Sequence, residues 1–297
     1  MRRTYALEVK GRIFTLGLRT WIMGILNVTP DSFSDGGAYS DKDKAVERGL
    51  EMIEEGADII DVGGESTRPG SRSISIEEEL ERILPVVRGI RKSTTALLSV
   101  DTMKAAVAEA ALEAGADIIN DVSAFRFDPR MPGVVSGHGA AVILMHMKGT
   151  PESMQLDPRY TDIFYEIRWF LKDRIEEASS AGIGRERIIV DPGIGFGKSP
   201  VDNLALIDNL GFLEGLGCPV MAGVSRKSFI GKALNVPLTE RLEGSIAAGV
   251  LSIARGAHIL RVHDVRATRR AADMADAILT GKMGNETGGD KEKGYAG

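Results

Sequence analysis

The sequence has few residues that could build a sulfur or imidazole site. Among 297 residues there is a single cysteine, Cys218, so no disulfide can form within the chain. With four histidines beside that cysteine, a structural zinc site is not expected. We therefore interpret Cys218 as a small apolar filler of the core.

Long apolar runs and an excess of basic charge are also missing. No stretch has the length of a membrane helix, and the N-terminal "MRRTYALEVK" lacks the apolar segment of a signal peptide. The net charge of −5 provides no basic field to hold nucleic acid. These absences predict a cytoplasmic protein that binds neither nucleic acid nor a membrane. An apolar fraction of 43% is enough for a sizeable core.

One sequence plan recurs along the chain. It is a helix end, a Gly-Ala turn, a short run of Ile or Leu, and then polar residues, as in "EEGADIIDVGG" (54–64), "LEAGADIINDVSA" (112–124) and "IARGAHILRVHDV" (253–265). A glycine after a helix is typical of a left-handed cap, and an Ile-rich run is typical of a strand buried on both faces. The plan indicates alternating strands and helices with a parallel sheet.

Eight such strands are predicted, and they suggest a closed barrel. They cover about residues 22–28, 57–63, 96–101, 117–122, 140–146, 187–192, 219–225 and 258–263. Helical spacing lies between them at about 41–56, 75–92, 103–115, 160–182, 242–256 and 264–279. The fold class expected is a (β/α)8 TIM barrel, with an open doubly wound sheet as the alternative.

The two ends of the chain fall outside this pattern. Residues 4–19 alternate like a short hairpin, which could close the bottom of the barrel. Residues 283–297 lack apolar content and are predicted to be a disordered tail. We expect one barrel domain over residues 1–282.

Polar residues cluster where the predicted strands end, which is where barrels carry function. Arg261 and His263 are two residues apart, so both side chains leave their strand on one side, and with Arg68 they could clamp a phosphate or diphosphate. The alternative for Arg261 is a salt bridge to a neighbouring barrel carboxylate.

A second set of strand ends suits a flat heterocycle. Asp101, Asn120 and Asp191 offer acceptors and donors to amide and amidine edges, and Lys227 offers a donor to a carbonyl or ring nitrogen. The alternative is an internal ion-pair network.

The glycine-rich "DPGIGFGKS" (191–199) is not a nucleotide P-loop, because it lacks the GxxxxGK[ST] spacing. Its glycines would instead let Phe196 approach a flat ring, while Lys198 could be solvated. Met145 or Met147 could form the floor under that ring. For His146, between the two methionines, a packed structural role is preferred over a ligand role.

Together these motifs resemble one family. In order, "IMGILNVTPDSFSDGG", "DIIDVGGESTRPG", "SVDT", "IIND", "MHMKGTPESMQ", "DPGIGFGK", "SRKS" and "RVHDV" are similar to the signature stretches of dihydropteroate synthases, over about residues 20–280. The resemblance implies a folate-pathway transferase that forms a C–N bond. It would join 7,8-dihydropterin-6-ylmethyl diphosphate to 4-aminobenzoate and release diphosphate and 7,8-dihydropteroate. The family is also the target of sulfonamides.

The resemblance also implies site residues. For the pterin they are Asp101, Asn120, Met145, Asp191, Phe196, Gly223 and Lys227. For the diphosphate they are Asn27, Thr67, Arg68, Arg261 and His263, with Asn27 also reaching a Mg2+ ion. For 4-aminobenzoate they are Phe33, Pro69, Lys227 and Ser228. Catalysis would fall to Asp101, Asp191, Lys227, Arg261 and His263.

Two other functions remain open from the sequence. A pterin-binding methyltransferase uses a similar barrel, but would have no need of the diphosphate clamp. A non-catalytic pterin-binding protein is the second alternative. The Ala-rich helices around 242–280 predict a homodimer interface.

Overall fold

The computed structural model describes residues 2–29, 38–66, 71, 73–154 and 158–282. Within these ranges a ring of eight parallel strands forms the centre of the molecule. The strands are β3 (Trp21–Asn27), β4 (Ile59–Gly63), β5 (Leu97–Asp101), β6 (Ile118–Asp121), β7 (Ala141–Met145), β8 (Ile188–Asp191), β9 (Met221–Ala222) and β10 (Ile259–Val262). Each coincides with a strand predicted from the sequence.

The ring is closed, which makes the fold a TIM barrel. The hydrogen-bonded order runs β8-β7-β6-β5-β4-β3-β10-β9. The remaining seam, between β8 and β9, is closed by a parallel bridge of Val190 with Val220, where the Val190 N–H donates to the carbonyl of Pro219 over 3.0 Å. The alternative of an open sheet is therefore wrong.

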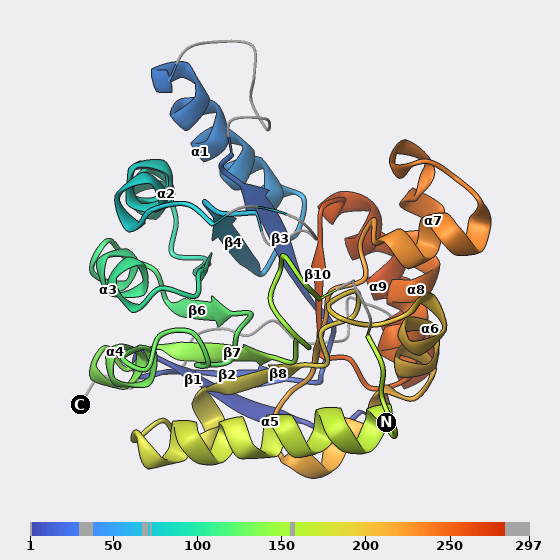
Figure 1. Cartoon of the computed structure of the whole chain (residues 1–297). Helices are drawn as coiled ribbons and strands as arrows, with labels where there is room; N and C mark the ends of the chain where they lie inside the picture. The colour runs from blue at the N-terminus through green and yellow to red at the C-terminus, as the bar shows by residue number, and fades with distance from the viewer. Residues whose placement is uncertain (1, 30–37, 67–70, 72, 155–157, 283–297) are drawn as a thin grey trace.

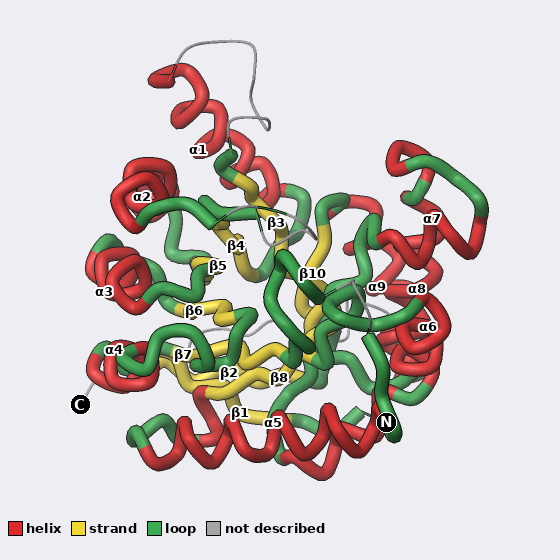
Figure 2. The backbone as a smooth tube through the Cα atoms, viewed as in Figure 1, coloured by secondary structure: helices red, strands yellow, loops and turns green. Residues whose placement is uncertain are grey.

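Helices surround the strands on the outside. In Figure 1, α1 to α4 cover one side of the barrel and α6 to α9 cover the opposite side. The helix α5 runs along the outside of the barrel at the lower edge of the view, between these two groups. The tube in Figure 2 shows the same alternation of strand and helix along the chain. The helices are α1 (Ala38–Glu54), α2 (Ile76–Ser93), α3 (Ala105–Glu113), α4 (Met131–Gly137), α5 (Ile163–Ser180), α6 (Pro200–Asp208), α7 (Ser228–Leu234), α8 (Leu242–Ala254) and α9 (Val265–Thr280).

Local sequence signals set where helices begin. Ser75 accepts a hydrogen bond from the backbone of Glu78 at the start of α2, and Asp162 does the same at the start of α5. Ser199 and Asp202 form a capping box that starts α6, with Pro200 in its first turn. The helix α6 therefore begins directly after the glycine-rich turn that follows β8.

The lower half of the barrel is packed with apolar side chains and covered by a hairpin. Residues 4–19 contain β1 (Tyr5–Val9) and β2 (Arg12–Leu16), paired antiparallel. Leu7, Val9 and Leu16 are fully buried in one cluster with interior residues of the barrel strands. The hairpin thus extends the barrel core at the bottom.

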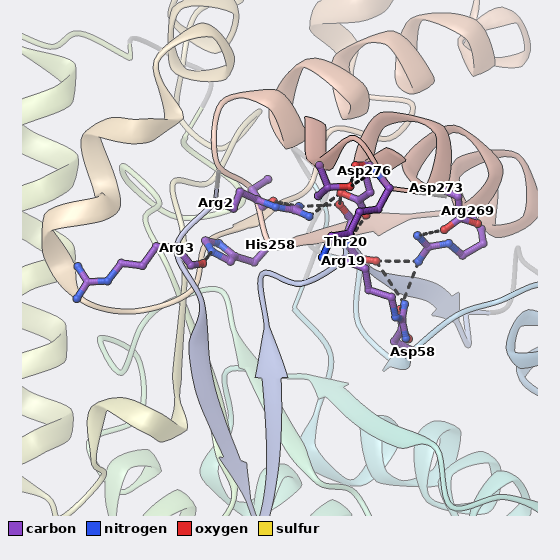
Figure 3. Close-up of polar contacts among 12 residues, drawn as sticks. Arg2, Arg3, Arg19, Thr20, Asp58, His258, Arg269, Asp273 and Asp276 are labelled. Carbon is purple, nitrogen blue, oxygen red and sulfur yellow. Dashed lines mark hydrogen bonds and ion pairs between the residues drawn. The ribbon is translucent and has the colours of Figure 1, made fainter. Parts of the chain in front are cut away.

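Polar contacts fasten this end of the molecule. Asp276 of α9 accepts hydrogen bonds from the backbone N–H of Thr20 (2.5 Å) and from Arg2 (2.6 Å) (Figure 3). His258 accepts from the Val220 N–H at Nδ1 over 3.1 Å, and its Nε2 lies 2.9 Å from the carbonyl oxygen of Arg3. Burial lowers the pKa of His258 to about 4, so the imidazole is neutral and donates through Nε2.

Cys218 is buried in the layer between strands and helices, as the sequence predicts for an apolar filler. Burial raises the pKa of its thiol to about 12, which keeps it protonated and unreactive. The described residues contain no helix long and apolar enough to cross a membrane. The predicted tail, 283–297, lies outside the described residues.

Candidate functional site

The interior of the barrel changes from apolar to charged toward the carboxyl ends of the strands. On β4, Ile59 belongs to the apolar interior cluster, whereas Ile60 and Val62 face the helices. Because side chains alternate along a strand, Asp61 shares the inner face with Ile59. Asp61 is fully buried and pairs in register with Ser99 of β5. A carboxylate therefore lies inside the barrel one layer above the apolar core.

The next interior positions complete a polar layer. Asp101 pairs in register with Asn120, and Met145 pairs with Asp191. Asp101, Asn120 and Asp191 are all buried. The structure thus brings together three of the side chains predicted to hold a heterocycle, at the mouth of one barrel.

Arg261 enters this layer from β10 and forms two ion pairs. Its Nε donates to Oδ2 of Asp61 over 2.6 Å, and its Nη2 donates to Oδ2 of Asp101 over 2.8 Å. The salt bridge weighed as the alternative role of Arg261 is therefore present. Nη1 has no hydrogen bond to any described residue, so this guanidinium still has donors for an anion.

Several buried oxygens in the mouth have no hydrogen-bond partner among the described residues. They are Oδ1 of Asp61, Oδ1 of Asp101, Oδ1 of Asn120 and Oγ of Ser99. A buried polar atom without a partner costs about 1–3 kcal/mol, so four of them in one layer indicate a place for a polar ligand. Burial raises the pKa of Asp101, and the charges of Asp61 and Glu79 add to that rise against the opposing effect of Arg261.

Lys227 and Phe196 form one side of the mouth. The Lys227 ammonium lies 4.0 Å from the centre of the Phe196 ring, a cation–π contact. Burial lowers the pKa of Lys227 to about 7. Gly195, at φ +86°, permits this approach, because a Cβ there would lie 2.8 Å from Cδ of Lys227.

Asp191 is held in place by the same glycine-rich turn. Its Oδ1 accepts the backbone N–H of Gly193 over 2.6 Å. A Cβ on Gly223 would lie 3.9 Å from Oδ2 of Asp191 and 4.0 Å from Cβ of Arg261, so this glycine keeps space open between the two side chains. Burial raises the pKa of Asp191.

An apolar cluster adjoins these polar groups. Met145, Met147 and Phe196 are buried together with Val122 and Met154. A flat heterocycle would therefore meet apolar side chains on its face and Asp, Asn and Lys on its edges.

His263 follows β10 and lies beside the turn after β9. Ser225 Oγ is 3.0 Å from Nδ1 of His263 and accepts the His263 backbone N–H over 3.2 Å. Arg226, with φ +56°, is fixed by a two-bond ion pair to Asp264. These contacts fix the turn that carries Lys227.

The structure places Lys198 and His146 in contact with each other at the glycine-rich turn. Lys198 is 2% exposed, so the expectation that it is solvated is wrong. Its ammonium is enclosed by the backbone of the turn and by His146. His146 is buried and packs edge-on against Phe170, which agrees with the structural role preferred for it.

Two of the residues predicted at the rim of the mouth, Asn27 and Ser228, are among the described residues. Asn27 is half-buried at the end of β3, and Ser228 is exposed as the first residue of α7. The remaining predicted residues of the rim, Phe33, Thr67, Arg68 and Pro69, lie outside the described residues.

Sequence reasoning missed two residues of the mouth. Asp61 lies inside a quoted motif, and a charge between Ile59–Ile60 and Val62 is the signal that could have found it. Ser225 lies within "SRKS", but its role depends on the neighbouring strand, which no local pattern reveals.

Among the described residues, no group of three or more His, Cys, Asp or Glu side chains could hold a metal ion. A divalent ion here would need other oxygen ligands. The amide oxygen of Asn27 is of the chemical type that Mg2+ accepts, together with phosphate oxygens and waters.

Comparisons with known proteins agree with this geometry. A family model described as "Pterin binding enzyme" matches residues 23–263. The chain is 47% identical to the dihydropteroate synthase of Clostridium beijerinckii over 274 residues, 92% of this chain and 99% of that protein.

Solved structures give the same result. The Xanthomonas albilineans dihydropteroate synthase with 4-aminobenzoic acid is 46% identical, with a TM-score of 0.87 over 93% of this chain and 99% of that one. The Yersinia pestis dihydropteroate synthase with a sulfonamide drug complex is 43% identical, with a TM-score of 0.86 over 93% of this chain and 99% of that one.

Proposed function

The chain belongs to the dihydropteroate synthase family of pterin-binding enzymes, and from that we propose how its own residues divide the reaction between them. The reaction is a transfer that forms a C–N bond. It joins 7,8-dihydropterin-6-ylmethyl diphosphate to 4-aminobenzoate and releases diphosphate and 7,8-dihydropteroate. The observation that carries the assignment of residues is the set of buried oxygens above the apolar half of the barrel that have no hydrogen-bond partner among the described residues.

The pterin occupies the barrel mouth in this proposal. Asp191 accepts hydrogen bonds from its 2-amino edge, Asp101 and Asn120 meet the other ring edges, and Lys227 donates to a carbonyl or ring nitrogen. The rings lie between Phe196 and Met145, and Gly223 leaves room beside Asp191. The partnerless Oδ1 atoms of Asp101 and Asn120 support this placement, because each would gain a donor.

The diphosphate lies above the pterin at the rim. Nη1 of Arg261 and the imidazole of His263 donate to its oxygens, with Arg68 and Thr67 assigned by family resemblance. Asn27 would hold a Mg2+ ion together with oxygens of the diphosphate. When bound, the ion supplies positive charge to the departing diphosphate.

The chemical step is substitution at the exocyclic methylene carbon. The C–O bond to the diphosphate breaks with its electron pair leaving on the diphosphate, and the amine nitrogen of 4-aminobenzoate forms the new C–N bond and then loses a proton. The ring system shares the positive charge that develops on carbon, and Asp101 and Asp191 stabilise that charge electrostatically. Arg261 and His263 stabilise the charge on the diphosphate. No residue has to act as a covalent nucleophile.

The 4-aminobenzoate borders Ser228 and Lys227 on the described side of the rim, with Phe33 and Pro69 assigned to it by resemblance. Ser228 is exposed and follows Lys227 directly, so a ligand on this side lies next to the pterin edge that Lys227 meets. That position brings the amine close to the methylene carbon.

We also propose a homodimer through α6 and α8. Val201 and Leu204 of α6 and Leu251 of α8 are exposed by 73%, 49% and 54%, and the two helices contact one another. Exposed apolar side chains on two adjoining helices are typical of a subunit interface. Sedimentation of the wild type and of Leu251→Glu tests it, and a monomeric wild type would contradict it.

The proposed reaction is tested by diphosphate release. We expect release from the wild type only when the pterin diphosphate and 4-aminobenzoate are both present, and a strong loss in Asp191→Asn. Transfer of a methyl group, or pterin binding without diphosphate release, would favour the methyltransferase or the non-catalytic protein instead.

A further inference from the structure

Lys198 is a buried lysine that the proposed mechanism does not use. It is 2% exposed and forms no ion pair with any described residue. Removing an ammonium group from water is costly unless its donors are satisfied, and burial lowers the pKa of Lys198 well below the usual range. The contacts of Lys198 should therefore explain why a lysine is buried at this position.

Those contacts join two strand ends. The Lys198 Nζ lies 2.9 Å from the carbonyl oxygen of Phe196 and 3.3 Å from that of His146. It also lies 3.0 Å from Nδ1 of the His146 ring. Phe196 belongs to the turn after β8, and His146 is the residue after β7, so one side chain ties the turn to the neighbouring strand.

The turn is pressed tightly against that strand. A Cβ on Gly193, at φ +69°, would lie 1.8 Å from the His146 carbonyl oxygen and 3.3 Å from the Lys198 Nζ. On the other side, the Gly195 N–H donates to Oδ1 of Asn203 over 2.6 Å. Lys198 and Asn203 therefore both hold the turn.

The fixed turn carries one wall of the pterin site. The Phe196 ring is in the apolar cluster with Met145, and the Lys227 ammonium lies over it at 4.0 Å. A shift of the Phe196 backbone would move the ring and the lysine that lies on it. The bond from Lys198 to the Phe196 carbonyl fixes this position together with the Phe196 N–H, which donates to the Gly193 carbonyl over 3.0 Å.

We propose that Lys198 is a positioning residue for pterin binding, which acts by holding Phe196 against the end of β7. It touches neither substrate. This role differs from that of a folding contact, because Lys198 would affect pterin affinity only through the position of the Phe196 ring. The inference assumes the pterin site of the proposed function.

A double-mutant cycle tests the link. Lys198→Met keeps the length of the side chain and removes its donors, and Phe196→Ala removes the ring. Binding of 6-hydroxymethylpterin is measured by calorimetry for the wild type, both single variants and the double variant, and thermal unfolding is recorded for each. Lys10→Met is the matched control, because the Lys10 ammonium also donates to a backbone carbonyl, that of Leu112 over 3.1 Å, but lies in the hairpin at the bottom of the barrel.

We expect Lys198→Met to weaken pterin binding about tenfold in the wild-type background, the scale of one lost hydrogen bond that orders a ligand contact. In the Phe196→Ala background the same change should have less than about a twofold effect, because coupled residues are not additive. Lys10→Met should bind as the wild type does. If Lys198→Met does not fold, Lys198→Gln, which keeps an amide donor, takes its place in the cycle.

Equal losses in the two backgrounds, or no loss from Lys198→Met, would overturn the inference and leave Lys198 as a folding contact. A wild type that does not bind the pterin would instead overturn the proposed function.

Discussion

The hydroxyl of Ser225 lies 3.0 Å from Nδ1 of His263 and also accepts the backbone N–H of the same histidine over 3.2 Å. One side chain from the turn after β9 thus fixes both the backbone and the ring of a residue after β10. A serine hydroxyl can donate to Nδ1 of a neutral imidazole or accept from a protonated one. The ring therefore keeps its orientation in either state, with Nε2 directed away from Ser225.

We expect Ser225→Ala to weaken diphosphate binding by about fivefold to tenfold, the effect of one lost hydrogen bond. The barrel should remain folded, because Cβ is retained. Ser225→Thr keeps the hydroxyl and should restore most of the affinity. Calorimetry with diphosphate and Mg2+ measures the effect, and unchanged affinity in a folded Ser225→Ala variant would show that His263 does not depend on this contact.

Arg261→Ala should lower stability as well as activity. The change leaves Asp61 and Asp101 buried without their cation, and removing one member of a buried pair costs about 3–5 kcal/mol of unfolding free energy. Adding Asp61→Asn should recover part of that loss, because one uncompensated charge disappears. Urea denaturation of the single and double variants measures both effects. A single variant as stable as the wild type would mean that the two carboxylates are protonated or solvated without Arg261.

Asp191→Asn tests pterin recognition without the loss of stability that we expect for Arg261→Ala. The Asn Oδ1 can still accept the Gly193 N–H, so the turn should keep its shape. An amide nitrogen would replace an acceptor oxygen, and a lost hydrogen bond to a charged group costs about 1.5–3 kcal/mol of binding free energy. Pterin titration measures the loss, with Asp173→Asn, at a half-buried position on α5, as control. Wild-type affinity in the folded variant would exclude this role.

The low pKa of Lys227 predicts how stability varies with pH. The pKa is about 7 in the folded protein, whereas an unfolded lysine titrates near ~10.4. Between these values the unfolded chain binds more protons, so the contribution of Lys227 to stability rises with pH and is constant below about pH 7. Relative to Lys227→Met, the unfolding free energy of the wild type should rise by up to about 1.4 kcal/mol per pH unit above pH 7. Parallel pH profiles of the two proteins in urea denaturation would refute this.

Asp276→Ala separates stability from activity. The change removes the acceptor of Thr20 and the partner of Arg2 at the bottom of the barrel. We expect a loss of about 3–5 kcal/mol of unfolding free energy, seen as a lower melting temperature. The rate per folded molecule should stay at the wild-type value, because the site lies at the other end of the strands. A lower kcat at a temperature where the variant is fully folded would contradict this.

The sequence was most informative where periodicity was strong. The buried strands and the long helices α1, α2, α5, α8 and α9 follow directly from apolar spacing. The sequence does not predict α4, α6 and α7, because each is only seven to nine residues long and contains Gly, Pro or Asn, whereas the equally short α3 is rich in Ala and is predicted.

At the site, sequence reasoning identified side chains but not their pairing. Asp101, Asn120 and Asp191 were found because they end apolar runs. The partners of Arg261 could not be found, because they come from β4 and β5, 200 and 160 residues earlier in the chain. Lys198 was misjudged for the same reason: a lysine after a glycine-rich turn is usually exposed, and only the packing of that turn on β7 encloses it.

The hairpin beneath the barrel has a kinetic consequence. Leu7, Val9 and Leu16 continue a fully packed apolar interior, so in the described part of the chain the lumen is solid from the bottom up to the polar layer. Substrates and products therefore have to pass through the mouth at the carboxyl ends of the strands. In the proposed arrangement the pterin lies deepest, so we expect the pterin diphosphate to enter before 4-aminobenzoate, and diphosphate to leave the rim before the product. A barrel closed at one end thus predicts ordered binding and release, in which the pterin is bound first and leaves last as part of the product.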